Sequence, residues 1–101
     1  MSHAMIDIET LGTKPGCIIQ SIGAVLFDPF GKPVEMYPFY RNISKQSCLD
    51  IGLTEDPNTV KWWSEQSDIA KTHLLHDQVD IASAMSDLQI WCIEKRFKYN
   101  R

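Results

Sequence analysis

Positions 4–27 read AMIDIETLGTKPGCIIQSIGAVLF, and this stretch decides the fold that we expect. Residues 4–9 have the apolar alternation of a short strand that opens the protein, and residues 10–16 have the Gly and Pro content of a loop. Residues 17–27 are apolar and rich in β-branched side chains, which favours a second strand. The chain is therefore expected to begin with two strands that are joined by one loop.

Turn-forming residues follow the second predicted strand. Residues 28–32 read DPFGK, which is typical of a five-residue hairpin loop. Residues 33–40 are rich in aromatic side chains and are expected to return as a third strand. Pro38 favours an edge position for that strand, because proline has no N–H to donate to a neighbouring strand.

The second half of the chain carries the signals of helices. Asp56 precedes a proline, as an N-cap does, and this predicts a helix over about residues 57–66. Ser67 is expected to cap a second short helix that runs through Leu75. Asp80 is expected to cap a third helix with one buried apolar face. That face comprises Ile81, Ala84, Met85, Leu88 and Cys92.

Strands followed by helices indicate an α/β or α+β fold that opens with three antiparallel strands. No internal repeat, low-complexity tract or Ser/Gly-rich linker divides the sequence. We therefore expect residues 1–101 to form part of a single domain, with the helices packed on the sheet.

Composition excludes several classes of protein. The 101 residues are 44% hydrophobic and 23% charged, with a net charge of -3, which is too small to predict a basic nucleic-acid coat. No apolar run approaches the roughly 18 residues that a membrane span requires, and no membrane partner is expected. Cys17, Cys48 and Cys92 lack CxxC spacing and are expected to be reduced and buried. Reduced thiols favour a cytoplasmic location.

Asp7 and Glu9 are the most informative pair in the sequence. They lie two apart in a predicted strand, so both carboxylates project from one face, while Ile6 and Ile8 are expected to point into apolar packing. Hard oxygen ligands at this spacing suit Mg²⁺ or Mn²⁺, and one carboxylate can bridge two ions. A solvated strand end is the alternative interpretation of the same two residues.

Three segments in order resemble one family. The first strand ends in D-x-E-T at Asp7, Glu9 and Thr10, the second strand carries IGAV at residues 22–25, and residues 56–67 read DPNTVKWWSEQS. Together they resemble the DEDD-family 3′-5′ exonucleases, and more narrowly the small bacterial and phage exonucleases of the ribonuclease H-like superfamily. The resemblance implies a ribonuclease H-like fold whose first strand is central in the sheet.

The resemblance also implies roles for particular residues. Asp7 would bridge two divalent ions, Mg²⁺ or Mn²⁺, and Glu9 would hold one of them. Thr10 and Leu11 would contact the terminal nucleotide through backbone and apolar surface. The resemblance covers essentially the whole of this chain, but this chain corresponds to only about the first half of the family's domain. The family's second-motif Asp, and the His and Asp of its third motif, have no counterpart before Arg101.

Further residues could take part in such a site. Trp62 and Trp63 cannot share a helical face; one is expected in the core, and Trp63 is favoured as the one beside the cleft, where a base could stack. His73 and His76 are three apart, which suits either a transition-metal pair or, as we favour, surface histidines. The basic, aromatic tail at residues 95–101 suits a phosphate-tracking patch or an ordinary helix end.

Two functional hypotheses follow. The first is a 3′-5′ exonuclease that acts on single-stranded RNA or DNA ends by two-metal-ion hydrolysis, with this chain carrying the first motif. The second is a catalytically inactive, truncated exonuclease-like fragment that acts as an interaction module through an open sheet edge. A homodimer that completes the site combines the two.

Overall fold

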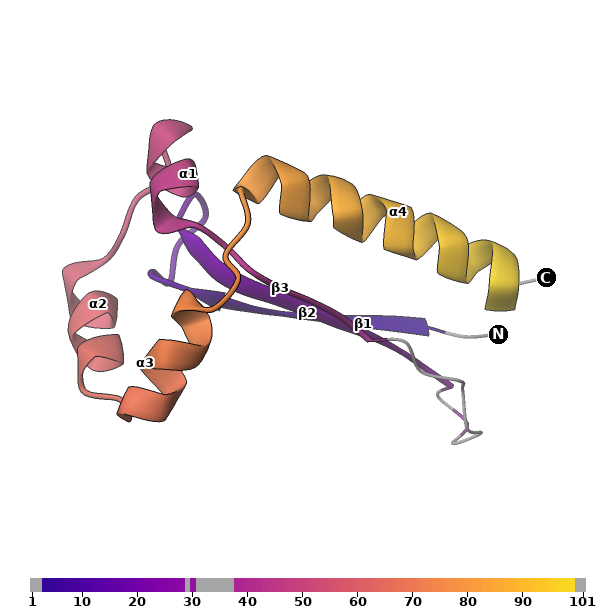
Figure 1. Cartoon of the computed structure of the whole chain (residues 1–101), viewed down its shortest axis with the longest axis horizontal. Coiled ribbons are helices and arrows are strands. Elements are labelled where there is room, and N and C mark those ends of the chain that lie inside the picture. Colours follow the sequence, from indigo (N-terminus) through magenta and orange to yellow (C-terminus); the bar gives the residue numbers. More distant parts are fainter. Residues whose placement is uncertain (1–2, 29, 31–37, 100–101) are drawn as a thin grey trace.

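The computed structural model describes residues 3–28, 30 and 38–99, and of residues 96–99 the backbone alone. Its sheet contains β1 (His3–Thr10), β2 (Ile19–Phe27) and β3 (Phe39–Asn42) in the order β1-β2-β3, and every pairing is antiparallel (Figure 1). The strands precede all the helices, so the expected α+β arrangement of three antiparallel strands followed by helices is confirmed. Of the predicted third strand at residues 33–40, residues 33–37 lie outside the described residues, and β3 extends two residues beyond the predicted end, to Asn42.

The expectation of a central first strand is wrong for this sheet. β1 pairs with β2 and, within the described ranges, with no other strand. After β3 the described chain continues into helices rather than into a strand, so nothing is added to the outer edge of β1. β3 occupies the opposite edge and directly follows Pro38, which fits the edge position expected from that proline.

Three short helices gather at the end of the sheet where β1 ends and β2 begins (Figure 1). They are α1 (Lys45–Asp50), α2 (Pro57–Ser64) and α3 (Asp68–Leu75). The predicted caps are confirmed, since the side chain of Asp56 accepts a hydrogen bond from the N–H of Asn58 and that of Ser67 accepts one from the N–H of Ala70. Sequence reasoning missed α1, whose N-cap is Ser44.

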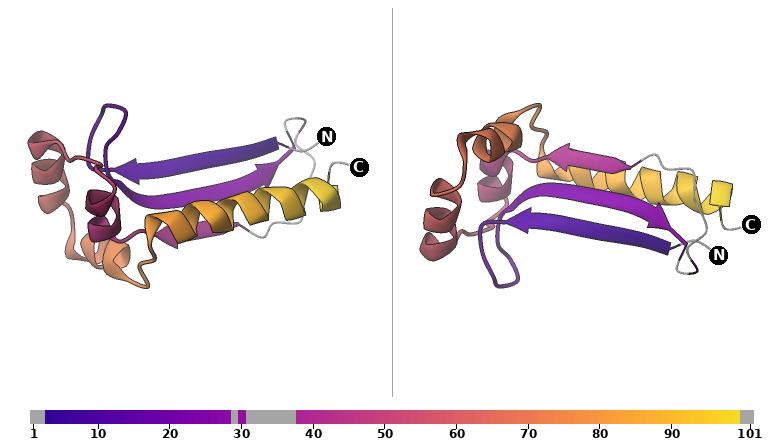
Figure 2. Two further views of the ribbon diagram at one scale, coloured as in Figure 1. Left: turned by 90° about the horizontal axis from the view of Figure 1, so that it is seen from above. Right: turned by 90° about the horizontal axis from the view of Figure 1, so that it is seen from below.

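The long helix α4 (Ile81–Tyr99) runs along the sheet on the side of β3 (Figure 2). The carboxylate of Asp80 caps it by accepting from the N–H of Ala82 at 2.8 Å, as predicted. The prediction that Met85 belongs to the buried face is wrong, because its side chain is 48% exposed. Trp91 is buried instead, at 8% exposed, and its ring centroid lies 6.2 Å from that of Phe39. The residues of α4 that face β3 are spaced three, four and three apart along the helix, and Met85 lies to the side of the face that they form. These positions are Ile81, Ala84, Leu88 and Trp91.

Ile6 and Ile8 pair across the sheet with the buried residues Ala24 and Ile22, so they lie on the same face as the core. They are nevertheless about half exposed, which corrects the expectation that they enter apolar packing. The cause is the position of α4, which covers β3 and leaves β1 open beside it (Figure 2). The molecule measures 44 × 27 × 25 Å and is therefore elongated along the strands.

The three cysteines are free, and Cys48 is the fully buried one, while Cys17 and Cys92 are half-buried. The expectation of buried thiols therefore holds for one of the three. Within the described residues, no helix combines the length and the apolar character needed to cross a bilayer.

Candidate functional site

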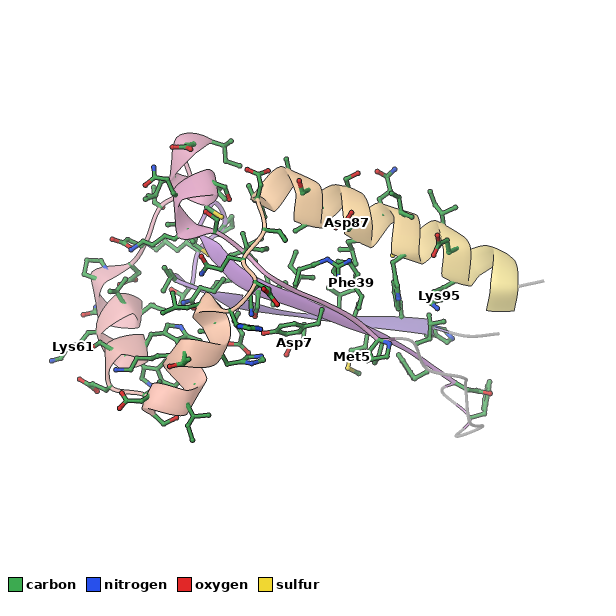
Figure 3. The ribbon with its side chains drawn as sticks, viewed as in Figure 1. Met5, Asp7, Phe39, Lys61, Asp87 and Lys95 are labelled. Atoms are coloured by element: carbon green, nitrogen blue, oxygen red, sulfur yellow. The ribbon has the colours of Figure 1, made fainter. Side chains whose placement is uncertain are left out.

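Asp7 and Glu9 lie on the face of the sheet that is turned away from α4. Their partners across β2 are Gly23 and Ser21, whereas Phe39 lies on the α4 side of the sheet (Figure 3). Because a strand rises about 3.4 Å per residue, the Cα atoms of the two acids stand about 6.8 Å apart. The prediction that their side chains share one face is confirmed by this register.

The two carboxylates line a hollow of about 370 Å³. Its volume falls in the range of about 300–1,000 Å³ that small-molecule sites occupy. Across the part of the chain that the structure describes, neither carboxylate accepts a hydrogen bond or forms an ion pair. Asp7 is exposed and Glu9 is partly exposed, so water solvates their oxygens and leaves them free for a ligand. The pair thus offers carboxylate oxygens that no cation or hydrogen-bond donor of the described residues engages.

The opposite wall of this hollow comes from β3 and α3, and sequence reasoning did not assign it. Tyr40 and His73 line the hollow together with the two acids, and their rings stand 5.5 Å apart between centroids. Asn42 holds this wall in place: it is 6% exposed, accepts a hydrogen bond from the Tyr40 hydroxyl at 2.8 Å and donates to the carbonyl of His73 at 2.7 Å. No local pattern could have joined residues that are 31 positions apart.

Trp63 links the loop after β1 to the helical end of the molecule. Its indole N–H donates to the carbonyl of Thr10 at 3.1 Å, and its side chain lines the hollow beside the carboxylates. Trp62 packs edge-on against it at 5.0 Å between centroids and is 54% exposed. Trp63 therefore stands beside the acids, as favoured from the sequence, but neither tryptophan is fully buried in the core.

Thr10 and Leu11 are largely engaged within the protein. The Thr10 hydroxyl donates to the carbonyl of Gly12 at 2.7 Å, and the N–H of Leu11 donates to the carbonyl of Ile18 at 2.9 Å. The Leu11 side chain is 5% exposed and lines a second hollow of about 280 Å³, on the other side of Trp63. Neither residue lines the hollow at the acids, and their contact with a terminal nucleotide stays a prediction.

The remaining sequence candidates lie away from the acids. His76 caps the C-terminus of α3, and its Nε2 lies 3.0 Å from the Asp77 carboxylate. The two histidines of the considered metal pair thus face different surroundings. Of the basic tail at residues 95–101, the structure describes the side chain of Lys95 and the backbone of residues 96–99, which end α4, and residues 100 and 101 lie outside the described residues.

The donor set of this site fits a hard divalent cation. Within residues 3–28, 30 and 38–95, no cluster of three or more His, Cys, Asp or Glu side chains is arranged to hold a metal ion. Mg²⁺ commonly takes one or two protein carboxylates and fills its remaining positions with water and substrate phosphate oxygens. The unpaired carboxylates of Asp7 and Glu9 match that need in ligand type and number.

Comparison with protein-family models finds the Rv2179c-like family, described as a 3′-5′ exoribonuclease Rv2179c-like domain, over residues 2–100. The chain belongs to this family. No curated protein and no solved structure matches it. The match supports the exonuclease expectation at the level of the family: it indicates a nuclease, that is, a hydrolase that acts on nucleic acid.

Proposed function

We propose that this chain supplies the first two metal ligands of a 3′-5′ exoribonuclease of the DEDD type, with a ribonuclease H-like fold. Asp7 and Glu9 would hold Mg²⁺ or Mn²⁺ at the hollow, for hydrolysis assisted by two metal ions. The substrate would be the 3′ end of a single-stranded RNA, in keeping with the exoribonuclease description of the family. The observation that carries the proposal is the pair of unpartnered carboxylates on one face of β1.

The reaction class follows from the family. Hydrolysis adds water across the terminal phosphodiester and releases a nucleoside 5′-monophosphate. Bound divalent ions supply Lewis-acid polarisation of the phosphate and an activated water. The chain's own part is positional, since β1 holds both carboxylates on the rim of a hollow whose other walls are Trp63 and the ring pair of Tyr40 and His73.

A direct test separates metal binding from turnover. Binding of Mn²⁺ is measured as the decrease of the free-ion signal in electron paramagnetic resonance, for the wild type and for the Asp7→Asn and Glu9→Gln variants. Asp50→Asn is the matched control, because Asp50 is an exposed carboxylate on α1 that does not line the hollow. We expect saturable binding that both site variants lose and the control keeps; wild-type protein without Mn²⁺ binding would overturn the proposal.

Turnover is then assayed with 5′-labelled single-stranded RNA and DNA in Mn²⁺. Because this chain carries the first motif alone, little turnover is expected from it, and stepwise shortening from the 3′ end that disappears in the Asp7→Asn, Glu9→Gln double variant would mean that a second chain supplies the other ligands. Shortening that persists in the double variant would show a contaminating nuclease or another site, and would contradict the assignment of these acids.

A second candidate function is favoured by the open edge of β1. This edge has no strand partner within the described ranges, and Met5, Ile6 and Ile8 beside it are exposed. An unpaired edge of this kind can accept a strand from another chain. We propose a second copy of this chain as that partner, which would give a homodimer and bring two carboxylate pairs into one assembly.

Light scattering after size-exclusion chromatography tests the dimer. The Ile6→Lys, Ile8→Lys variant is expected to shift the protein to monomer, because it places charge along the edge. Ile69→Lys is the control, since Ile69 is 85% exposed on α3 and should have no effect. A wild-type protein that is monomeric at high concentration would rule out this candidate.

A further inference from the structure

The hollow at Asp7 and Glu9 needs a hydrogen-bond donor if a phosphate is to lie in it. Two carboxylates repel an anion, and a bound cation offsets that repulsion at one side of the phosphate. The remaining phosphate oxygens are strong acceptors, and they bind most favourably to N–H or O–H groups. A side chain that lines the hollow and has an unused N–H or O–H could supply that donor.

Most donors that line the hollow are already used or are inaccessible. The Tyr40 hydroxyl donates to Asn42 at 2.8 Å, and the Trp63 indole donates to the Thr10 carbonyl at 3.1 Å. Ser21 is 2% exposed on the floor of the sheet. His73 is exposed, and within the described part of the chain its ring nitrogens have no hydrogen-bond partner.

The position of His73 is fixed before any ligand arrives. The amide of Asn42 donates to the carbonyls of both His73 and His76, at 2.7 and 2.8 Å, and so ties the end of α3 to β3. The imidazole in turn packs against the ring of Tyr40 at 5.5 Å between centroids. A donor that is held in place loses little conformational freedom on binding, which favours affinity.

We propose that His73 binds a phosphate oxygen of the nucleotide held at Asp7 and Glu9, by donating an imidazole N–H. Imidazole carries at least one N–H in both of its protonation states, so the contact does not require a charged ring. The inference rests on the proposed function, because it places the nucleotide at the metal-binding acids. It adds a phosphate-binding residue on α3, outside the D-x-E-T motif.

The test measures binding of adenosine 5′-monophosphate and of adenosine by isothermal titration calorimetry in Mg²⁺. We expect His73→Ala to weaken binding of the monophosphate about tenfold, as for one lost hydrogen bond to a charged group, and to leave the affinity for adenosine as it is in the wild type. His73→Gln keeps an N–H donor and should recover most of the affinity. His76→Ala is the matched control, because His76 ends the same helix and pairs with Asp77 instead.

The outcomes separate this inference from the proposed function. An equal loss for monophosphate and adenosine would show a wall contact without phosphate recognition and would overturn the inference. Unchanged monophosphate affinity, or none in the wild type, would also overturn it, while Mn²⁺ binding that depends on Asp7 would leave the proposed function standing. Monophosphate binding that depends on His73, without any Mn²⁺ binding, would support the inference and overturn the metal site. Circular dichroism of each variant checks that it is folded.

Discussion

Gly12 shows how a single residue shapes the loop beneath the carboxylates. A Cβ built at this position would lie 2.7 Å from the Cβ of Cys17, closer than side chains approach. Cys17 cannot easily move away, because it forms an isolated parallel bridge with Thr54. The loop that follows β1 therefore closes on itself at a position where a hydrogen in place of a side chain is required.

Gly12→Ala is expected to lower the free energy of unfolding by about 1–3 kcal/mol, the usual cost of forcing extra atoms into a packed site. Urea denaturation followed by tryptophan fluorescence measures this difference. Gly23→Ala is the control, since its new Cβ would meet the Tyr40 ring at 3.7 Å, an ordinary contact. Equal stability of Gly12→Ala and the wild type would show that the loop can open without cost.

At the scale of elements, the short helices depend on their caps. α2 and α3 have eight residues each and bury no residue fully, and helices this short are marginal in water without outside contacts, so their caps matter beside their packing. Both begin with a side chain that accepts a backbone N–H. Because α2 carries Trp63, the cap of α2 also bears on the wall of the carboxylate hollow.

Asp56→Ala is expected to lower the free energy of unfolding by about 1 kcal/mol, because it removes the acceptor for the Asn58 N–H. Asp68→Ala serves as the comparison: it removes an exposed carboxylate whose ion pair with Lys71 spans 3.6 Å, and such a pair contributes about 0–1 kcal/mol. Thermal unfolding of both variants tests the ranking. A larger loss for Asp68→Ala would mean that the α2 cap is not a principal stabilising contact.

At the scale of the whole molecule, the sheet separates two regions. One face packs against α4 through Phe39 and Trp91, and the other carries Asp7 and Glu9 (Figure 3). The helices that complete the carboxylate hollow lie at the end of the sheet and not along it. Stability from α4 and ligand binding at the acids therefore arise on opposite sides of the same strands.

Trp91→Ala is expected to destabilise the fold by about 3–5 kcal/mol, the range for deleting a buried large aromatic side chain. Mn²⁺ binding at low temperature should persist in the milder Trp91→Phe variant, because α4 does not line the carboxylate hollow. Ile90→Ala, at a position 51% exposed on the same helix, is the control and should change stability little. Loss of Mn²⁺ binding in a folded Trp91→Phe protein would contradict this separation.

The local pattern of the sequence was sufficient for the first two strands, for three of the four helices and for the common face of the acid pair. Alternation predicted the first strand, and an apolar, β-branched composition predicted the second. Asp56, Ser67 and Asp80 marked the starts of three helices, because a cap is a contact between residues two or three apart. The common face of Asp7 and Glu9 follows from the two-residue period of any strand, whatever surrounds it.

Tertiary structure alone decided what those elements face. Trp91 is buried and Met85 is exposed. Helix periodicity shows which residues share a face, but the packing of the helix against the sheet decides which of the neighbouring faces is buried. Tertiary structure also left β1 at an edge and placed His73 opposite the acids through the amide of Asn42. Such contacts join residues far apart in the chain, and their free energy depends on packing and burial that exist only after the elements have assembled.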